Sequence, residues 1–555
     1  MQKLFYRLIF VVFLMVVSVS CSPASAYWIP PSSPPTQSAE AAPFSETVVQ
    51  IQTPTSTSTL AQSSQLLSPT PEETAGSTLE STPLDPQNGT ALDTESLATS
   101  LSILPTFTAT PEIYVVNTAP ILYYAQAADT LPVVAVRFGV SLAEITSSEP
   151  IPETNFINPG QLLIIPRKLT NTTSAAQLIP DSEVVYSPSA VDFDAVAYAQ
   201  QAGGYLNTFS EWHKSTRMKS GAEIVMRVAI ENSINPRLLL ALLEYQSHWV
   251  YGHPEGQEQS EYPMGYTQPI AKGLFNQLVW AGNQLSIGYY AYREGRLTEI
   301  HFSDGVTARL APDLNAGTAA LQYYFAQFLD SRQWLDALDT EIGFPALYST
   351  MFGDPWERAG TIEPLFPPGI SQPPLTLPFT RNWTWSYTGG PHGAWEQEGA
   401  YAALDFAPGS NKTGCAETNA WVVAPAAGLV VRTSLGLVVI DLDGDGHEQT
   451  GWVLIVLHVA TEDRIPLGSW VAVGDSLGHP SCEGGFATGT HIHIARKYNG
   501  EWVPADGPLP FNLGGWIAHY SGNPYKGTLT RNGVTVIANV NSNAPSFVTR
   551  TDDDP

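Results

Sequence analysis

The chain has 555 residues, which is too long for one hydrophobic core and predicts roughly three or four folded units. Its 52 acidic and 25 basic side chains give a formal net charge of -27. This charge disfavours nucleic acid and anionic membrane surfaces as electrostatic partners, so binding to any anionic polymer would need a dedicated module.

The N-terminus predicts export. Two basic residues precede an apolar run over residues 8–19, a signal-peptide pattern that is short for a membrane span. Ala24-Ser25-Ala26 fits a cleavage site that ends the leader at residue 26. Ser18-Val19-Ser20-Cys21 is an imperfect lipobox, with serine where leucine is usual, which makes Cys21 a candidate for lipidation. We favour the lipoprotein because the cysteine directly follows the apolar run; the alternative is a secreted protein.

Residues 27–111 are rich in serine, threonine and proline and contain few aromatic residues. Such a segment cannot bury enough apolar surface to offset the entropy of ordering. We expect a disordered spacer, which would let a tethered protein reach away from a membrane.

Residues 112–168 predict a small folded module. Thr130 or Asp129 can cap a helix that Gly139 ends, Asn158-Pro159-Gly160 predicts a turn, and residues 162–165 have strand composition. The segments Asp129-Thr130-Leu131, Phe138-Gly139-Val140 and Asn158-Pro159-Gly160-Gln161 resemble the lysin motif (LysM). That resemblance implies a βααβ fold and binding to glycans that contain N-acetylglucosamine. The alternative is a packing module without glycan affinity.

After a linker over 169–189, residues 190–365 predict a mainly helical domain. Apolar residues recur at helical spacing over four segments: 222–234, 237–249, 274–293 and 314–338. The segment from Asn235 to Ser247 is similar to the catalytic helix of lysozyme-like lytic transglycosylases, with Gln246 where those enzymes carry glutamate. Glutamine cannot donate the proton that glycosidic cleavage needs, and Glu244 points to another helix face. We therefore expect a lysozyme-like domain without glycosidase activity that can still hold glycan.

Residues 366–525 predict a mainly antiparallel β domain, followed by an extension over 526–555 with a short β segment and an acidic, disordered end. Strand composition is found over 421–433, 437–442, 452–459 and 491–497. Residues 441–446 resemble the start of a calcium loop, but position twelve is Trp452 rather than glutamate. A hairpin turn is the preferred interpretation, and calcium stays open.

Five residues of this domain have the chemistry of a zinc hydrolase: His392, Asp405, His458, His491 and His493. Imidazole and carboxylate are zinc ligands, and a catalytic zinc keeps three protein ligands and one open position. His491 and His493 project from the same face of a predicted strand, so both can reach one cavity. The alternative for an isolated His-x-His pair is a structural role.

The context of these residues resembles the lysostaphin-type (LytM) zinc metalloendopeptidases. The carrying segments are Gly389-Gly390-Pro391-His392, Leu404-Asp405-Phe406, Val456-Leu457-His458 and Thr488-Gly489-Thr490-His491-Ile492-His493. The long spacing from His392 to Asp405 is similar to the beta-lytic branch. The resemblance covers roughly residues 385–525. It implies that His392, Asp405 and His493 bind Zn²⁺ and that His458 and His491 perform the proton chemistry.

The cysteines predict one disulfide. Cys21 is lost or lipidated, which leaves Cys415 and Cys482 in an oxidising compartment. Cys482 lies in the segment leading to His491, so a bridge would tie loops at the site. Two separate buried thiols are the alternative.

These features predict an exported, cell-wall-associated zinc endopeptidase that cleaves the peptide cross-links of peptidoglycan. A secreted general protease acting on glycine-rich proteins is one alternative, and a non-catalytic wall scaffold or hydrolase activator is another. The five site residues would serve any peptide, so the substrate class rests on the resemblances.

Overall fold

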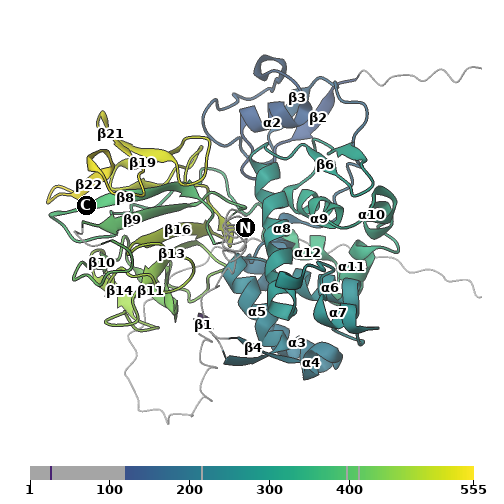
Figure 1. Ribbon diagram of the computed structural model, residues 1–555. Coiled ribbons are helices and arrows are strands. Elements are labelled where there is room, and N and C mark those ends of the chain that lie inside the picture. The colour runs from purple at the N-terminus through teal and green to yellow at the C-terminus, as the bar shows by residue number, and fades with distance from the viewer. Residues whose placement is uncertain (1–24, 28–118, 214–216, 396–397, 410–412, 555) are drawn as a thin grey trace, which may run out of the picture. The chain divides into compact units, whose positions relative to one another are not determined.

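The structure, a computed structural model, describes residues 25–27, 119–213, 217–395, 398–409 and 413–554 (Figure 1). The expected leader up to Ala24, the candidate lipidation site Cys21 and the spacer over 28–111 lie outside the described residues. All of these described residues belong to one compact unit. Among the described residues, no helix has the length and hydrophobicity to cross a membrane.

The first folded module is a two-stranded sheet packed on one helix. Thr130 caps this helix by accepting a hydrogen bond from the backbone N–H of Val133, and Gly139 ends it in a left-handed conformation. Where the lysin-motif resemblance implies a second helix, the structure has a single 3-10 turn. The elements are β2 (Ile121–Tyr124), α2 (Leu131–Phe138), η1 (Leu142–Glu144) and β3 (Leu162–Ile165).

Three of the four predicted helices of the next region are confirmed, as α5 (Gly221–Asn232), α6 (Pro236–Ser247) and α8 (Leu274–Arg293). The predicted helix over 314–338 is two helices, because Asp330 caps a new one. The remaining helices and 3-10 turns are α3 (Ala195–Ala202), α4 (Tyr205–Thr208), α7 (Gln257–Glu261), η4 (Pro269–Ala271), α9 (Ala316–Ala326), α10 (Ser331–Ala337), α11 (Phe344–Phe352) and α12 (Pro355–Ala359). Two hairpins, β4 (Ser210–His213) with β5 (Arg217–Ser220) and β6 (Glu299–His301) with β7 (Thr307–Arg309), complete this part.

Part of the expected linker belongs to the helical region. Residues 179–187 are buried and include the 3-10 turn η2 (Asp181–Glu183), and η3 (Pro188–Ala190) follows directly. Ile179, Val184 and Val185 belong to the same apolar cluster as the helices. The linker expected over 169–189 therefore ends before residue 179.

The C-terminal region is mainly β, as predicted, and is built on an antiparallel ten-stranded sheet. Its main order is β1-β11-β12-β13-β16-β9-β8-β22, with β14 added to β11 and β17 added to β16. The strands are β1 (Ser25–Tyr27), β8 (Trp383–His392), β9 (Ala403–Pro408), β11 (Gly428–Ser434), β12 (Gly436–Asp441), β13 (Trp452–Val459), β14 (Trp470–Val471), β16 (Ile492–Tyr498), β17 (Glu501–Trp502) and β22 (Phe547–Arg550).

The predicted strand over 421–433 is two strands, since Pro425 lies between them and proline cannot donate to a ladder. The C-terminal end also differs from the expected disordered tail: Asp554 is buried and forms an ion pair with Arg531. The remaining strands are β10 (Val422–Val423), β15 (Ser476–Gly478), β18 (Asn512–Leu513), β19 (Trp516–Tyr520), β20 (Gly527–Arg531) and β21 (Val534–Ile537), and η5 (Ala544–Ser546) precedes β22.

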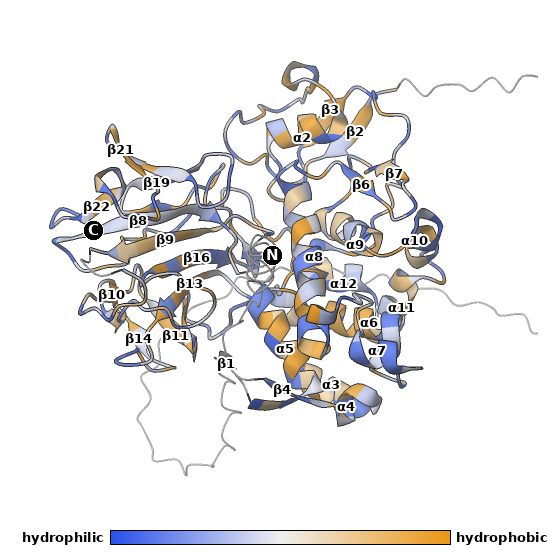
Figure 2. Cartoon of the chain, viewed as in Figure 1, coloured by the Kyte–Doolittle hydropathy of each residue, from blue (hydrophilic) through white to orange (hydrophobic). Residues whose placement is uncertain are grey.

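The large sheet is buried on both faces, which explains why its strands are apolar runs. Alternate residues of a strand face opposite sides. In β13, Val453 and Ile455 pack in one cluster with the helices, whereas Leu454 and Val456 pack in a second cluster. Figure 2 shows the hydrophobic residues along α5 and α8. The helical region, residues 179–365, therefore shares its core with one face of the sheet. We call this region the helical layer.

This shared core predicts that residues 366–525 are unstable alone. The fragment would expose the sheet face that the helical layer covers and would lose β22, the partner of β8 at the sheet edge. We expect it to aggregate, whereas residues 119–555 stay monomeric with one cooperative melting transition. Sedimentation and thermal melting compare the two fragments. A monomeric short fragment with the same melting temperature would contradict the shared core.

Candidate metal centre

The five predicted site residues lie on or beside four neighbouring strands. His392 ends β8, Asp405 lies on β9, His493 lies on β16, and His458 lies near the end of β13. The register pairs His493 with Asp405 on the next strand. His491 directly precedes β16. The structure therefore brings together residues that are up to about a hundred positions apart.

Three of these residues form a compact group of possible metal ligands. His392, Asp405 and His493 are buried, and one ligand atom of each lies within 4.8 Å of the others. His392 Nε2 is 3.3 Å from Asp405 Oδ1 and 3.0 Å from His493 Nδ1, and His493 Nδ1 is 3.4 Å from Asp405 Oδ1. Two imidazoles and a carboxylate are a donor set that suits zinc.

Backbone carbonyls fix the tautomers of the two histidines. His392 Nδ1 lies 2.8 Å from Gly390 O, and His493 Nε2 lies 2.9 Å from Ala394 O. A carbonyl oxygen only accepts, so these nitrogens carry the protons. Nε2 of His392 and Nδ1 of His493 are left to face Asp405. This second layer of hydrogen bonds orients metal-binding histidines in many proteins.

Electrostatics favour the coordinating protonation states of two of these residues, Asp405 and His493. Burial lowers the pKa of His493. Burial also disfavours the charge on Asp405, but His392 and His493 outweigh it and hold the pKa of that carboxyl well below its usual range. Burial opposes a charge on His392 as well, yet the Asp405 carboxylate outweighs it and raises the pKa of His392. Asp405 is therefore a carboxylate at neutral pH, and His493 is neutral.

Two observations of the protein itself fit a metal at this group. Asp405 Oδ1 is buried and accepts no hydrogen bond, although a buried carboxylate oxygen normally has a partner. Gly389 backs onto the same carboxylate, because a Cβ at position 389 would lie 2.4 Å from Asp405 Oδ2. Glycine at position 389 thus leaves room for the Asp405 carboxylate. The Oδ1 atom of that carboxylate is available to a cation.

His458 and His491 stand beside this group. Their ring centroids are 4.4 Å apart, and the His458 ring is 6.4 Å from that of His493. His458 Nδ1 donates to Glu483 O at 2.9 Å and His491 Nδ1 donates to Gly489 O at 2.7 Å, which leaves each Nε2 able to accept a proton. Burial, followed by His491 and His493, lowers the pKa of His458 to about 3, so it is neutral at neutral pH.

The backbone of His458 is held in a left-handed conformation, with φ of 64°. Such a conformation is uncommon for residues other than glycine and persists only where surrounding contacts enforce it. The enforcing contacts come from Ser481, whose N–H and hydroxyl donate to His458 O at 2.7 and 3.0 Å. The loop after β15 therefore sets the direction of this side chain.

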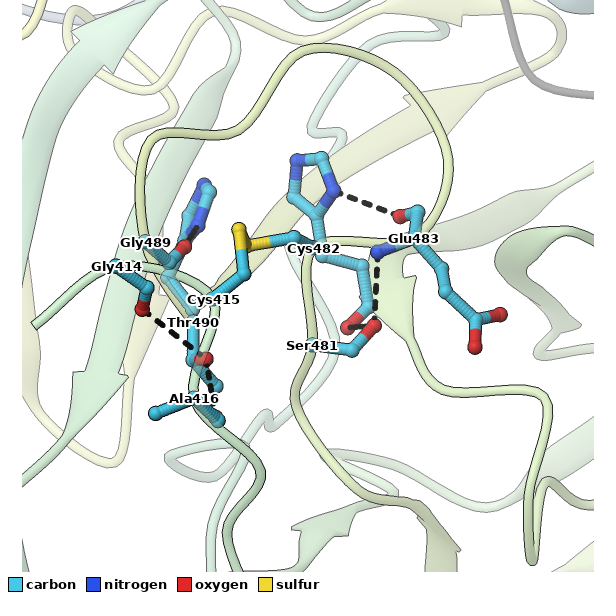
Figure 3. Close-up of a disulfide and its surroundings, with 10 residues drawn as sticks. Gly414, Cys415, Ala416, Ser481, Cys482, Glu483, Gly489 and Thr490 are labelled. Carbon is cyan, nitrogen blue, oxygen red and sulfur yellow. Dashed lines mark hydrogen bonds between the residues drawn. A yellow bond between two sulfur atoms is a disulfide. The ribbon is translucent and has the colours of Figure 1, made fainter. Parts of the chain in front are cut away.

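A disulfide joins Cys415 to Cys482 beside the two histidines, the same pair that the sequence analysis joins (Figure 3). Figure 3 shows Thr490 bridging to the other loop, with hydrogen bonds to the carbonyls of Gly414 and Ala416. Glu483, whose carbonyl holds His458, follows Cys482 directly. The bridge therefore ties together the segments that orient His458 and His491.

Tyr525 is a site residue that the sequence analysis missed. Its ring stacks on His392 with 4.1 Å between centroids, and it is half exposed. Tyr525 lies more than thirty residues from the nearest ligand, and no local pattern marks it. His479, near the site in sequence, is not part of the ligand group: its ring lies tilted against that of Trp421, 3.9 Å between centroids, and its Nδ1 hydrogen-bonds to Ala420 O.

Two further candidates have local structural roles. Asp441, with Asp443 and Asp445, lies in the hairpin between β12 and β13, and its carboxylate accepts hydrogen bonds from backbone N–H groups of that turn.

In the helical layer, Glu244 Oε2 accepts from the backbone N–H groups of Val250 and Tyr251 at 2.8 and 2.9 Å. The carboxylate nearest Gln246 is therefore committed to holding the turn after α6.

Comparison with known proteins connects this geometry to peptidases. Residues 177–366 match a family described as LasA, N-terminal domain. Protease LasA of Pseudomonas aeruginosa strain UCBPP-PA14 is 27% identical over 311 residues, covering 51% of this chain and 68% of that protein. Protease LasA of strain PAO1 is 26% identical over the same length and the same shares. The chain is thus similar, over about half of its length, to proteins named as proteases.

Solved structures give weaker matches. The M23 metalloprotease pseudoalterin, described as from the deep sea, shares 24% identity over 31% of this chain and 96% of its own, with a TM-score of 0.26. The catalytic domain of the antimicrobial peptidase lysostaphin from Staphylococcus simulans shares 19% identity over 22% of this chain and 90% of its own, with a TM-score of 0.17.

Gly389→Ala tests the space behind Asp405 without removing a ligand. The added Cβ would displace the carboxylate, so we expect zinc affinity to fall by about 10–100-fold, the usual effect of disturbing the surroundings of a ligand. Competition with a chromogenic chelator measures the affinity. Gly409→Ala is the matched control, since its Cβ would make only an ordinary contact, 3.7 Å from Thr384 O. Equal affinity in the two variants would rule out this role.

Removing the disulfide should destabilise the C-terminal β region. The two cysteines are 67 residues apart, and freeing a loop of that length typically costs about 2–5 kcal/mol of unfolding free energy. The Cys415→Ala/Cys482→Ala double variant should therefore unfold at lower urea concentration than the oxidised protein. If urea titration gives the same midpoint for both, the bridge is absent from the folded protein or irrelevant to its stability.

Proposed function

We propose that the protein is an exported zinc endopeptidase that cleaves the peptide cross-links of peptidoglycan. One observation carries the metal assignment: the buried oxygen of Asp405 without a hydrogen-bond partner, facing Nε2 of His392 and Nδ1 of His493. Zinc held by these residues would supply Lewis-acid activation of a water molecule and of the scissile carbonyl.

The proton chemistry belongs to His458 and His491. Each has its Nδ1 hydrogen bonded to a backbone carbonyl and its Nε2 able to take a proton from a nucleophilic water or give one to a leaving amine. The low pKa of His458 keeps it neutral at physiological pH, as a proton acceptor must be.

The substrate class and location rest on the sequence resemblances. The 112–168 module is proposed to bind N-acetylglucosamine-containing glycan, and the lysozyme-like interpretation of 190–365 adds an inactive glycan-holding surface. A leader over 1–26, with lipidation at Cys21 or cleavage after Ala26, would place the enzyme outside the cytoplasm, either anchored or secreted. The proposed domains are 112–168, 190–365 and 366–525, with residues 526–555 as a C-terminal extension.

His458→Ala should separate metal binding from catalysis. The side chain is outside the ligand group, so we expect zinc content to be unchanged, while loss of a general base lowers turnover by about 10²–10⁴-fold. The assay incubates the full-length zinc-loaded protein with isolated peptidoglycan and counts new free amines and new reducing ends separately. His301→Ala is the matched control, because His301 is exposed on β6 of the helical layer.

New amines that disappear with a chelator and with His458→Ala would support the endopeptidase. New reducing ends would point to glycosidase activity in the helical layer instead. Cleavage of glycine-rich proteins but of no peptidoglycan would favour the secreted general protease. Zinc binding without cleavage of either substrate would favour the wall scaffold or hydrolase activator.

A further inference from the structure

A cluster of buried charges joins the helical layer to the sheet that carries the metal centre. Arg293, at the end of α8, contacts Asp181 of η2 at 3.1 Å and Glu501 of β17 at 3.0 Å through the same Nη2 atom. These three side chains are at most 9% exposed. Because Glu501 belongs to the sheet and the other two to the helical layer, the cluster bridges the two parts.

A third carboxylate faces the same guanidinium. Glu363, after α12, accepts the backbone N–H of Ser182 at 2.7 Å and interacts electrostatically with Asp181, Arg293 and Glu501. Full ionisation would place three negative charges around one positive charge. A buried excess of like charge is costly, so it is relieved when carboxyls take up protons.

Arg293 is the cation that faces Glu501. The titratable groups facing Glu501 are Tyr289, Tyr290 and Arg293 of α8, Asp181 of η2, and Glu363. Tyr289 donates a hydrogen bond to Glu501 Oε2 at 3.3 Å, and Arg293 Nη2 donates one to Tyr289 at 2.9 Å. The single guanidinium is thus shared, and its pKa is held well above the usual value by Glu501, Tyr289 and Asp181 despite burial.

We propose that Asp181, Glu363 and Glu501 around Arg293 form a pH-sensitive contact that holds the helical layer on the sheet more firmly in mild acid than above neutral pH. The proposal does not depend on the peptidase function. A cavity of about 320 Å³ borders Arg293 and Glu501, with Phe156, Tyr290, Tyr401 and Tyr520 among its other lining residues. That volume accommodates several water molecules, which can carry protons to the cluster.

The direction of the effect follows from two carboxyls. Burial, followed by Asp181, raises the pKa of Glu363 to about 7, and burial, only partly offset by Arg293, raises the pKa of Glu501 to about 7. In the unfolded chain both would titrate near about 4.3. Their stabilising contribution is therefore complete below about pH 4.3 and is lost as the pH rises to about 7.

The contact lies on a strand next to one that carries a site residue. β17 pairs with β16, which carries His493. His493 and Ala495 project from the same face of β16, and Ala495 packs in the cluster shared with the helical layer. Trp502, next to Glu501, donates its backbone N–H to the Tyr290 hydroxyl at 2.8 Å, which gives a local reporter of the contact.

The test compares wild type with the Glu363→Gln/Glu501→Gln double variant at about pH 5 and about pH 8. We expect the wild-type unfolding constant to rise by roughly 10²-fold or more across this range from these two groups, and the double variant to lose that part of the rise. Urea titration measures the constant. Hydrogen exchange of the Trp502 amide, corrected for its intrinsic pH dependence, should show the same difference. Glu341→Gln, at an exposed position of the helical layer, is the matched control.

Equal pH dependence in wild type and a folded double variant would overturn the proposal. If the double variant does not fold, infrared titration in an Asp441→Asn/Glu294→Gln background decides, because burial also raises the pKa of these two carboxyls. A carboxylic acid absorption that persists above about pH 6 supports the proposal, and complete ionisation by about pH 5 contradicts it.

Discussion

The pairing of β9 with β16 is the constraint on which the site depends. It sets Asp405 opposite His493, and the next strand, β8, delivers His392 to the same point. In an antiparallel sheet a shift of one residue would turn each of these side chains to the opposite face. The apolar residues that alternate with them, such as Leu404 and Ile494, pack in the cluster on the other face and so secure this register. The burial that stabilises the sheet therefore also assembles the metal ligands.

Backbone groups near these paired strands orient the histidine side chains. Carbonyls of Gly390 and Ala394 orient the ligand histidines, and the carbonyl of Glu483 orients His458. The disulfide and the left-handed backbone conformation of His458 hold the segment around His458 in place. Residues that lack distinctive side-chain chemistry thus decide which nitrogen of each histidine faces the site.

The sequence predicted the parts whose signals are local. The strand over 452–459 and the helices at α5, α6 and α8 follow from periodicity, and the five site residues follow from motif order. The cluster of Asp181, Glu363 and Glu501 could not be predicted, because its members come from three separate segments. Periodicity shows that a helix has an apolar face but not what covers it, so the core shared by the helical layer and the sheet was also missed. Tyr525 was missed because it lies more than thirty residues from the nearest ligand and no local pattern marks it.

The most direct measurement is X-ray absorption spectroscopy at the zinc edge of the purified full-length protein, together with its metal content. The account predicts one zinc per chain, bound by two imidazole nitrogens and one carboxylate oxygen, as His392, His493 and Asp405 would provide. Loss of that spectrum in His493→Ala would tie it to this group. A protein that binds no zinc, or whose zinc spectrum is unchanged in His493→Ala, would contradict the assignment.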